Sequence, residues 1–448
     1  MRKLNLLSTL LILSLALLSC DKNNDNTNIS NTTSNEETTN IITYTIDDKY
    51  SLDNYIDNLI NETPSYVPSW NKESFKGRWN YIDGVFLNSI IEYSKIKKDN
   101  KYMDFVKEYV NYYINDNGEF LYIADKNNYE PTTENAFRKA ELDSFCESRI
   151  LFDLYDYTND KRYLNAIEAS YNYLLEMPIC SNNINYCHKS VYNNQIYLDG
   201  FYMYVPFLAR YAKYKKNNQI FDNLINQYRY VYENQRNKDN GLYYHCMDVS
   251  KSIFWADKET GVSKSVWTRS LGWFMMSIVD SLEYFPNDKQ TDLINILKEG
   301  LESIYKYMDK NSKMYYQLTD KGNVSYNVSY DKYLKYLNKN YKKDAVISNY
   351  LESSGSSMIA YTMIKAAKND YIDNKYLNIG IDTFIGTYNH SFNKNTNTLN
   401  DICITAGLGP EDKIYRDGTP EYYLAEPVGS NDAKGVGPFV MSYIEYIK

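Results

Sequence analysis

The feature that most limits the possible folds of this sequence is a helical hairpin that recurs along the chain. Beyond residue 45, apolar residues recur at spacings of three and four, which predicts amphipathic helices arranged in pairs. The first helix of each pair begins near residue 81, 142, 199, 268, 352 or 434. A recurrence of this kind is typical of an architecture built from repeated units.

The chain also supplies a second helix for each pair. Residues 268–285 pair with 290–309, residues 352–367 pair with 372–388, and a helix near 47–62 is left to partner the last one. Six hairpins can stack as an open solenoid or close into a ring. An N-terminal helix that completes the last pair favours closure. The sequence therefore predicts an all-α fold, the (α/α)6 barrel.

The composition excludes several other classes of protein. With 43% hydrophobic residues the chain can bury a large core, which excludes a disordered chain. The formal net charge of −8 gives no general basis for binding nucleic acid, and we expect no such partner. The chain has three His and no Cys-x-x-Cys spacing, so we expect neither a histidine-rich metal centre nor a zinc ribbon. Cys180 and Cys187 are close enough in sequence to close a small loop, and the sequence leaves open whether they form a disulfide.

The N-terminus resembles a bacterial lipoprotein signal. Within residues 1–19 a positively charged start is followed by an apolar run and a small-residue context before Cys20. This predicts a signal peptide and a lipid on Cys20, with a plain secreted protein as the alternative. Residues 20–44 are almost devoid of apolar side chains, which predicts a disordered tether. Residues 45–448 then form a single domain, the (α/α)6 barrel, in the cell envelope, facing the periplasm or the cell surface and held to the membrane by the lipid anchor only.

The first helices share openings rich in glycine, small and polar residues. If they form the inner ring, their six N-termini point to one end of the barrel, and their positive dipole ends favour an anionic ligand there. We expect this end to hold the functional residues, because unusual side chains gather near these starts: Trp79, Tyr81, Asp143, Asp199, His245, Trp267, Arg269 and Trp273.

Asp143 and Asp199 open consecutive first helices. Either one alone is explained by an ordinary N-cap. Two carboxyls at equivalent positions beside aromatic residues favour a catalytic pair, because neighbouring carboxyls separate each other's pKa values into an acid and a base. Arg269 between two indoles suits the carboxylate of an acidic sugar. His188 and Lys189 lie on the segment that leads to Asp199.

Three long stretches resemble the unsaturated rhamnogalacturonyl hydrolases, glycoside hydrolase family 105. They are residues 188–214, which contain YLDGFYM; residues 241–282, which contain SVWTRSLGW; and residues 352–439, from ESSGSS to AEPVGSNDAKGVGPF. The similarity spans roughly residues 75 to 448. The resemblance implies an (α/α)6 barrel that acts on oligosaccharides left by polysaccharide lyases. Such an enzyme hydrates the C4=C5 double bond of a terminal unsaturated galacturonate, which releases the neighbouring sugar, often rhamnose.

The resemblance also implies residue roles. Asp199 would protonate C4 and activate the water added at C5, and Asp143 would hold the substrate and tune Asp199. The remaining matches are substrate-binding positions: Trp79, Tyr81, Lys189, Tyr197, His245, Trp267, Arg269 and Trp273. Two departures put the leaving sugar in doubt, since Tyr197 stands where Trp is common and Cys246-Met247 follows His245. No metal or organic cofactor is implied, because carboxylate acid–base chemistry suffices.

Two alternatives remain open. The same barrel can act on unsaturated glucuronyl chains or carry out conventional inverting glycoside hydrolysis with both carboxylates. The chain can also be a non-catalytic, surface glycan-binding lipoprotein. The presence of both Asp143 and Asp199 speaks against the second alternative, since binding alone needs neither as an acid.

Overall fold

The computed structural model describes residues 47–62, 77–125, 128–132, 137 and 140–448. The predicted signal peptide, the lipidation of Cys20 and the tether over residues 20–44 lie outside these residues. In the described part of the chain, no helix has both the length and the apolar character needed to cross a bilayer.

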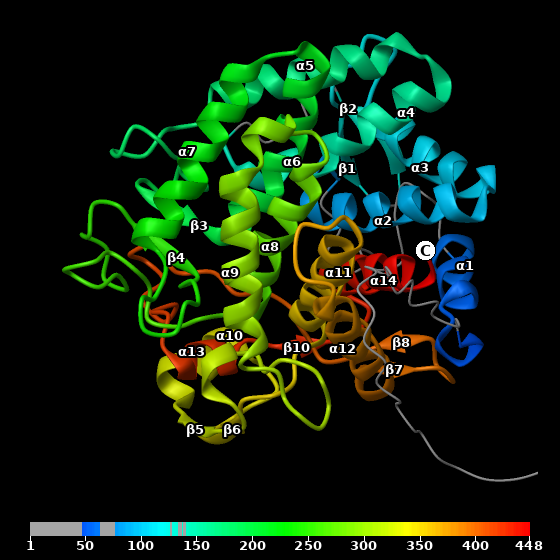
Figure 1. Ribbon diagram of the computed structural model, residues 1–448. Helices are drawn as coiled ribbons and strands as arrows, with labels where there is room; N and C mark the ends of the chain where they lie inside the picture. Colours follow the sequence, from blue (N-terminus) through cyan, green and yellow to red (C-terminus); the bar gives the residue numbers. More distant parts are fainter. Residues whose placement is uncertain (1–46, 63–76, 126–127, 133–136, 138–139) are drawn as a thin grey trace, which may run out of the picture. The chain divides into compact units, whose positions relative to one another are not determined.

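Contacts between elements show that six helical segments form a closed inner ring, and the labelled helices among them can be followed in Figure 1. Contacts run from α2 to α14, then to α11, α8 and α6, through the short helices η3 and η4, and back to α2. Because this series returns to its starting helix, the hairpins close and do not form an open solenoid. The inner segments are α2 (Tyr81–Lys97), η3 (Leu142–Phe145) with η4 (Glu147–Arg149) and α4 (Ile150–Thr158), α6 (Leu198–Lys215), α8 (Thr268–Leu282), α11 (Ser353–Lys368) and α14 (Ala433–Ile447).

The second helices pack outside this ring, each against the inner helix that precedes it in the chain. They are α3 (Asn100–Tyr113), α5 (Lys161–Leu175), α7 (Asn218–Asn234), α9 (Thr291–Tyr305) and α12 (Lys375–Ser391). The sixth, α1 (Asp53–Asn61), is the predicted partner of the last inner helix. Its Asp53 accepts hydrogen bonds from Tyr443 of α14 (2.8 Å) and Tyr93 of α2 (2.6 Å). The predicted (α/α)6 barrel is confirmed.

The difference between inner and outer helices follows from their sequences. Every residue of α8 is buried, whereas α7 buries one face whose apolar residues recur at spacings of three and four. Small residues let the inner helices approach closely. A Cβ added at Gly272 of α8 would lie 2.6 Å from the Cβ of Met358 in α11, so a larger residue there would push the two helices apart.

Short strands and turns connect the helices. Among the described residues they form five two-stranded antiparallel sheets: β1 (Tyr122–Asp125) with β2 (Asn128–Thr132), β3 (Gln195–Tyr197) with β4 (Cys246–Asp248), β5 (Ser325–Val328) with β6 (Ala345–Ser348), β7 (Phe392–Asn393) with β8 (Thr398–Leu399), and β9 (Ile402–Cys403) with β10 (Val428–Gly429). The remaining short helices are η1 (Asp48–Tyr50), η5 (Asn287–Lys289), η6 (Thr319–Lys321), η7 (Tyr330–Leu334), α10 (Lys335–Leu337) and α13 (Pro420–Ala425).

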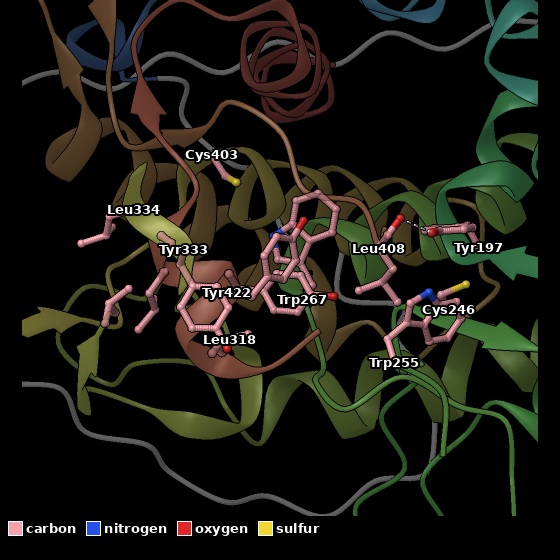
Figure 2. Packing of buried hydrophobic residues seen from close by; sticks show 14 of the residues in the cluster. Tyr197, Cys246, Trp255, Trp267, Leu318, Tyr333, Leu334, Cys403, Leu408 and Tyr422 are labelled. Carbon is pink, nitrogen blue, oxygen red and sulfur yellow. Dashed lines mark hydrogen bonds between the residues drawn. The ribbon is translucent and has the colours of Figure 1, made fainter. Parts of the chain in front are cut away.

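A cluster of buried apolar residues packs these connections against the starts of the inner helices (Figure 2). It brings together residues far apart in sequence, among them Tyr197, Trp255, Trp267, Leu408 and Tyr422. The cluster therefore fixes the segment after β9 against the loops that follow β4 and β5.

A charged network is buried between three inner segments. Asp280 of α8 is 1% exposed and bonds Lys365 of α11 (2.7 Å) and Arg149 of η4 (3.0 Å). Burial disfavours its ionisation, but the two cations outweigh this effect and lower the pKa of Asp280 to about 2. The network ties α8, α11 and η4 together inside the ring.

Candidate active site

A small cavity of about 130 Å³ lies where the inner helices begin. Its wall includes six of the residues selected from the sequence: Tyr81, Asp143, Lys189, Tyr197, Asp199 and His245. They come from the starts of α2, η3 and α6 and from the segments beside β3 and β4. The expected convergence of the first-helix starts at one end of the barrel is thus observed for these residues.

The β3–β4 pairing brings two of these segments together. Tyr197 of β3 pairs with Cys246 of β4, and the backbone N–H of Leu198 donates to the carbonyl of His245 (3.2 Å). This register places the imidazole of His245 beside the first turn of α6. Its Nε2 lies 3.2 Å from Oδ2 of Asp199.

Asp143 is paired with a lysine. Its carboxylate accepts a 2.6 Å hydrogen bond from Nζ of Lys189, which also contacts Glu141 at 3.2 Å. Burial opposes the charge of Lys189, but Asp143 and Glu141 outweigh it and hold the pKa of Lys189 above its ordinary value. His188 lies 3.4 Å from the same carboxylate, and burial lowers the pKa of this imidazole. The neighbouring ammonium favours the ionised form of Asp143.

Asp199 has a different surrounding. Within the described residues, it has no ion pair with a lysine or arginine, and its Oδ2 makes no hydrogen bond. The facing His245 is fully buried, and its Nδ1 is 2.7 Å from the hydroxyl of Tyr423. This hydroxyl fixes the orientation of the ring so that Nε2 faces the carboxyl. The two carboxyls of the cavity are therefore differentiated, one beside an ammonium and the other beside an imidazole.

Tyr197 forms the aromatic part of the wall. Its ring lies between those of His188 and His245, with centroid distances of 4.8 and 5.3 Å. Its hydroxyl donates to the carbonyl of Leu408 at 3.2 Å, as the dashed line in Figure 2 shows. The two ring contacts and the hydrogen bond fix the orientation of the Tyr197 ring, so that it forms a rigid part of the cavity wall.

Four residues selected from the sequence are not among those that line the cavity. Trp79 is fully buried, donates to Ser148 and packs on Phe120, and Trp273 stacks on Tyr202 inside the ring. Both are core residues in this structure.

Trp267 and Arg269 lie behind the cavity wall. The Trp267 ring is 4.8 Å from His245 and its Nε1 donates to Gln317 (3.0 Å). The guanidinium of Arg269 lies 4.6 Å from the Trp267 ring, is buried, and donates to the carbonyl of Cys403. Their placement supports the wall, and direct contact with a substrate stays a prediction.

The sequence interpretation missed several residues of the site, among them Tyr423 and Arg416. Tyr423 lies in the YYLAEP stretch that carries the resemblance, but nothing in the sequence connects it to His245, 178 positions away. Arg416, which lines the cavity, lies in a connecting segment without a motif. Among the described residues, no group of three or more His, Cys, Asp or Glu side chains is arranged to hold a metal ion.

Comparison with known families agrees with this architecture. The model of Glycosyl Hydrolase Family 88 matches residues 55–330 and 336–448. The chain belongs to glycosyl hydrolase family 88. This family 88 chain is similar to a solved glycoside hydrolase of family 105 from C. acetobutylicum, with 29% identity and a TM-score of 0.72 over 88% of this chain and 98% of the other.

Two further proteins are similar to this family 88 chain. It is 28% identical to protein Atu3128 of Agrobacterium fabrum over 250 residues, which are 54% of this chain and 97% of the relative. An unsaturated glucuronyl hydrolase specific for heparin shares the fold, with 14% identity and a TM-score of 0.59 over 89% of this chain and 97% of the other.

Proposed function

We propose that this family 88 protein hydrates the C4=C5 double bond of a terminal unsaturated uronate and so releases that sugar from an oligosaccharide. The observation that carries the proposal is the pair of differentiated carboxyls, Asp199 and Asp143, on one small cavity. One carboxyl facing an imidazole can exchange a proton, while the other, bound to Lys189, stays ionised.

Asp199 is the acid and then the base of the proposed reaction. Protonated Asp199 gives its proton to C4, and the electron pair of the double bond forms the new C–H bond. The positive charge that develops at C5 and the ring oxygen is stabilised by the carboxylate of Asp143. Water then adds to C5 and its proton passes to Asp199, which restores the acid. The C5 hemiketal opens, and the hemiacetal left at C1 releases the neighbouring sugar.

We further propose an unsaturated galacturonate linked to rhamnose as the substrate. Support comes from the stretches that resemble family 105 and from the 29% identity to a solved protein of that family. Lys189 and Arg416 on the wall favour an acidic sugar in any case. An unsaturated glucuronyl substrate is the second candidate. It is kept because Tyr197 stands where Trp is common in family 105, which changes the shape of the cavity wall.

The proposed reaction follows the action of a polysaccharide lyase, because lyases create the unsaturated end. A signal peptide over residues 1–19 and a lipid on Cys20 would place the enzyme in the cell envelope, where such oligosaccharides arrive. Mass spectrometry of the membrane fraction tests this part separately, since lipidation adds the mass of a diacylglyceryl group to the peptide that begins at Cys20.

The reaction is tested by the loss of ultraviolet absorbance of the unsaturated uronate. The purified protein is mixed with an unsaturated rhamnogalacturonan disaccharide and, separately, with an unsaturated glycosaminoglycan disaccharide. We expect a loss with the first substrate and none with Asp199→Asn. Asp160→Asn, which alters the N-cap of the outer helix α5, is the matched control and should retain activity. Loss with the glycosaminoglycan alone would select the second candidate, and no loss with either would refute the hydration reaction.

A further inference from the structure

The segment between β9 and α13 completes the cavity. The wall includes Thr405, Ala406, Gly407 and Arg416 of this segment together with the residues supplied by the inner helices. No residue of this segment was selected from the sequence, and the mechanism proposed above does not use it.

The segment is held in one conformation by contacts from three directions. The hydroxyl of Tyr422 bonds both the N–H (2.8 Å) and the carbonyl (2.6 Å) of Gly407. Nε1 of Trp255 donates to the carbonyl of Gly409 (3.2 Å), and Tyr197 holds Leu408, as seen in Figure 2. The turn therefore presents Arg416 from a fixed backbone.

Glycine is required where this turn is tightest. A Cβ at Gly409 would lie 2.2 Å from the carbonyl oxygen of Lys413, which is closer than two such atoms can approach. With glycine there, the backbone N–H of residue 409 donates to the carbonyl of Arg416 at 2.9 Å. This bond ties the base of the Arg416 side chain to the turn.

The guanidinium of Arg416 has unused donors. Its Nε is buried and, within the described residues, makes no hydrogen bond. Its Nη2 lies 3.5 Å from Oε1 of Glu426, which is a long contact. By contrast, Lys189 contacts both Asp143 and Glu141, and Arg269 is buried against the carbonyl of Cys403.

We propose that Arg416 binds the carboxylate of the uronate and makes the site selective for an acidic over a neutral sugar. A planar guanidinium with free donors matches a planar carboxylate through two parallel hydrogen bonds. This inference rests on the proposed function, because it assigns the group that recognises the substrate of the same site. In this proposal Arg416 binds the carboxylate in place of Arg269, which lies behind the cavity wall.

Glu426 adjusts the charge available to the ligand. It is 1% exposed, and burial raises its pKa to about 7 against the opposing effects of Arg416 and the hydrogen bond from Tyr422. Below pH 7 Glu426 is neutral and leaves the charge of Arg416 uncompensated; above pH 7 its carboxylate competes with the ligand. Affinity for the acidic sugar should therefore fall as the pH rises through about 7. The ionisable groups that face Glu426, which follows α13, are Arg416 of the segment between β9 and α13, Arg269 of α8, Cys403 of β9, and Tyr422 and Tyr423 of α13.

The assignment is tested by calorimetric titration of protein carrying Asp199→Asn, which binds without turnover. The probes are the unsaturated galacturonyl-rhamnose disaccharide and its methyl ester, which lacks the charge. We expect Arg416→Gln to weaken binding of the acid by roughly 10- to 100-fold and to change binding of the ester by less than about twofold. Lys413→Gln, which removes an exposed cation from the same turn, is the matched control and should change neither.

Two further variants separate charge from geometry. Arg416→Lys keeps the positive charge but lacks the planar guanidinium. It should weaken binding of the acid by less than Arg416→Gln does. Glu426→Gln should abolish the decline in affinity between pH 6 and 8. Equal weakening of acid and ester by Arg416→Gln, or no binding of the acid to the Asp199→Asn protein, would overturn the assignment. The proposed function fails by a different result, namely wild-type protein that leaves the absorbance of every substrate unchanged.

Discussion

The hydrogen bond between Tyr423 and His245 gives the sharpest test of how the site is built. Replacing Tyr423 by Phe removes one hydroxyl and keeps the ring that packs against Trp267. Tyr423 is fully buried and is not among the residues that line the cavity. Any effect on the reaction must pass through His245 and its contact with Asp199.

The magnitude follows from the burial of both partners. Tyr423 and His245 are both 0% exposed, so water cannot replace the lost hydroxyl. A buried polar atom left without its partner costs about 1–3 kcal/mol. If that free energy holds Nε2 of His245 toward Asp199, the fraction of protein in which the His245 ring has this orientation falls by roughly 5- to 150-fold. We therefore expect kcat to fall in this range while KM stays nearly constant.

The assay is the steady-state loss of uronate absorbance, with the free energy of unfolding measured in parallel. Tyr228→Phe is the matched control, because it removes a buried hydroxyl bonded to Ser277 (2.8 Å) between α7 and α8, away from the cavity. It should lower stability and leave kcat unchanged. If Tyr423→Phe lowers stability but keeps kcat within about twofold of wild type, the positioning role of Tyr423 is refuted.

Two other predictions concern stability. Asp280→Asn leaves Lys365 and Arg149 buried without their common carboxylate and should lower the free energy of unfolding by about 3–5 kcal/mol in urea titrations. Because the pKa of Asp280 is lowered to about 2, its contribution is present above about pH 4 and is lost as the pH falls toward 2. If the Asp280→Asn variant loses stability between about pH 4 and pH 2 as steeply as the wild type does, this assignment to Asp280 is wrong. The sulfur atoms of Cys180 and Cys187 lie 2.7 Å apart, so under oxidising conditions we expect a disulfide worth about 2.5 kcal/mol, seen as a peptide mass lower by two hydrogens. Alkylation of both thiols in unreduced native protein would exclude it.

The fold was predictable because its information is local. The starts expected near residues 81, 199, 268, 352 and 434 agree closely with those of α2, α6, α8, α11 and α14. The start near residue 142 is the informative exception. There the chain forms two 3-10 turns before α4, and the buried carboxylate of Glu147 accepts the backbone N–H of Asn80 from the neighbouring hairpin. A long-range contact of this kind leaves no periodic signal in the sequence.

The site was predictable only in part, for a related reason. Asp143, Asp199 and their neighbours were selected because they stand at equivalent places in repeated hairpins. Trp79 and Trp273 were selected because they lie near helix starts and match pocket positions of the resembled family, yet the structure buries both away from the cavity wall. An indole at a helix start can turn toward a ligand or toward its own barrel, and only its packing neighbours decide between these directions.

The sequence by itself determined the helical repeat and the two carboxyls at the helix starts, because apolar periodicity and helix starts are properties of nearby residues; it favoured closure of the ring, which contacts between α1, α2 and α14 establish. The tertiary structure alone decided which groups act together. Tyr423 reaches His245, Arg416 completes the wall and Arg269 withdraws behind it because segments separated by more than a hundred positions pack in one cluster. Free energies of a few kcal/mol between such distant partners set the chemistry of the site, and they exist only once the ring has closed.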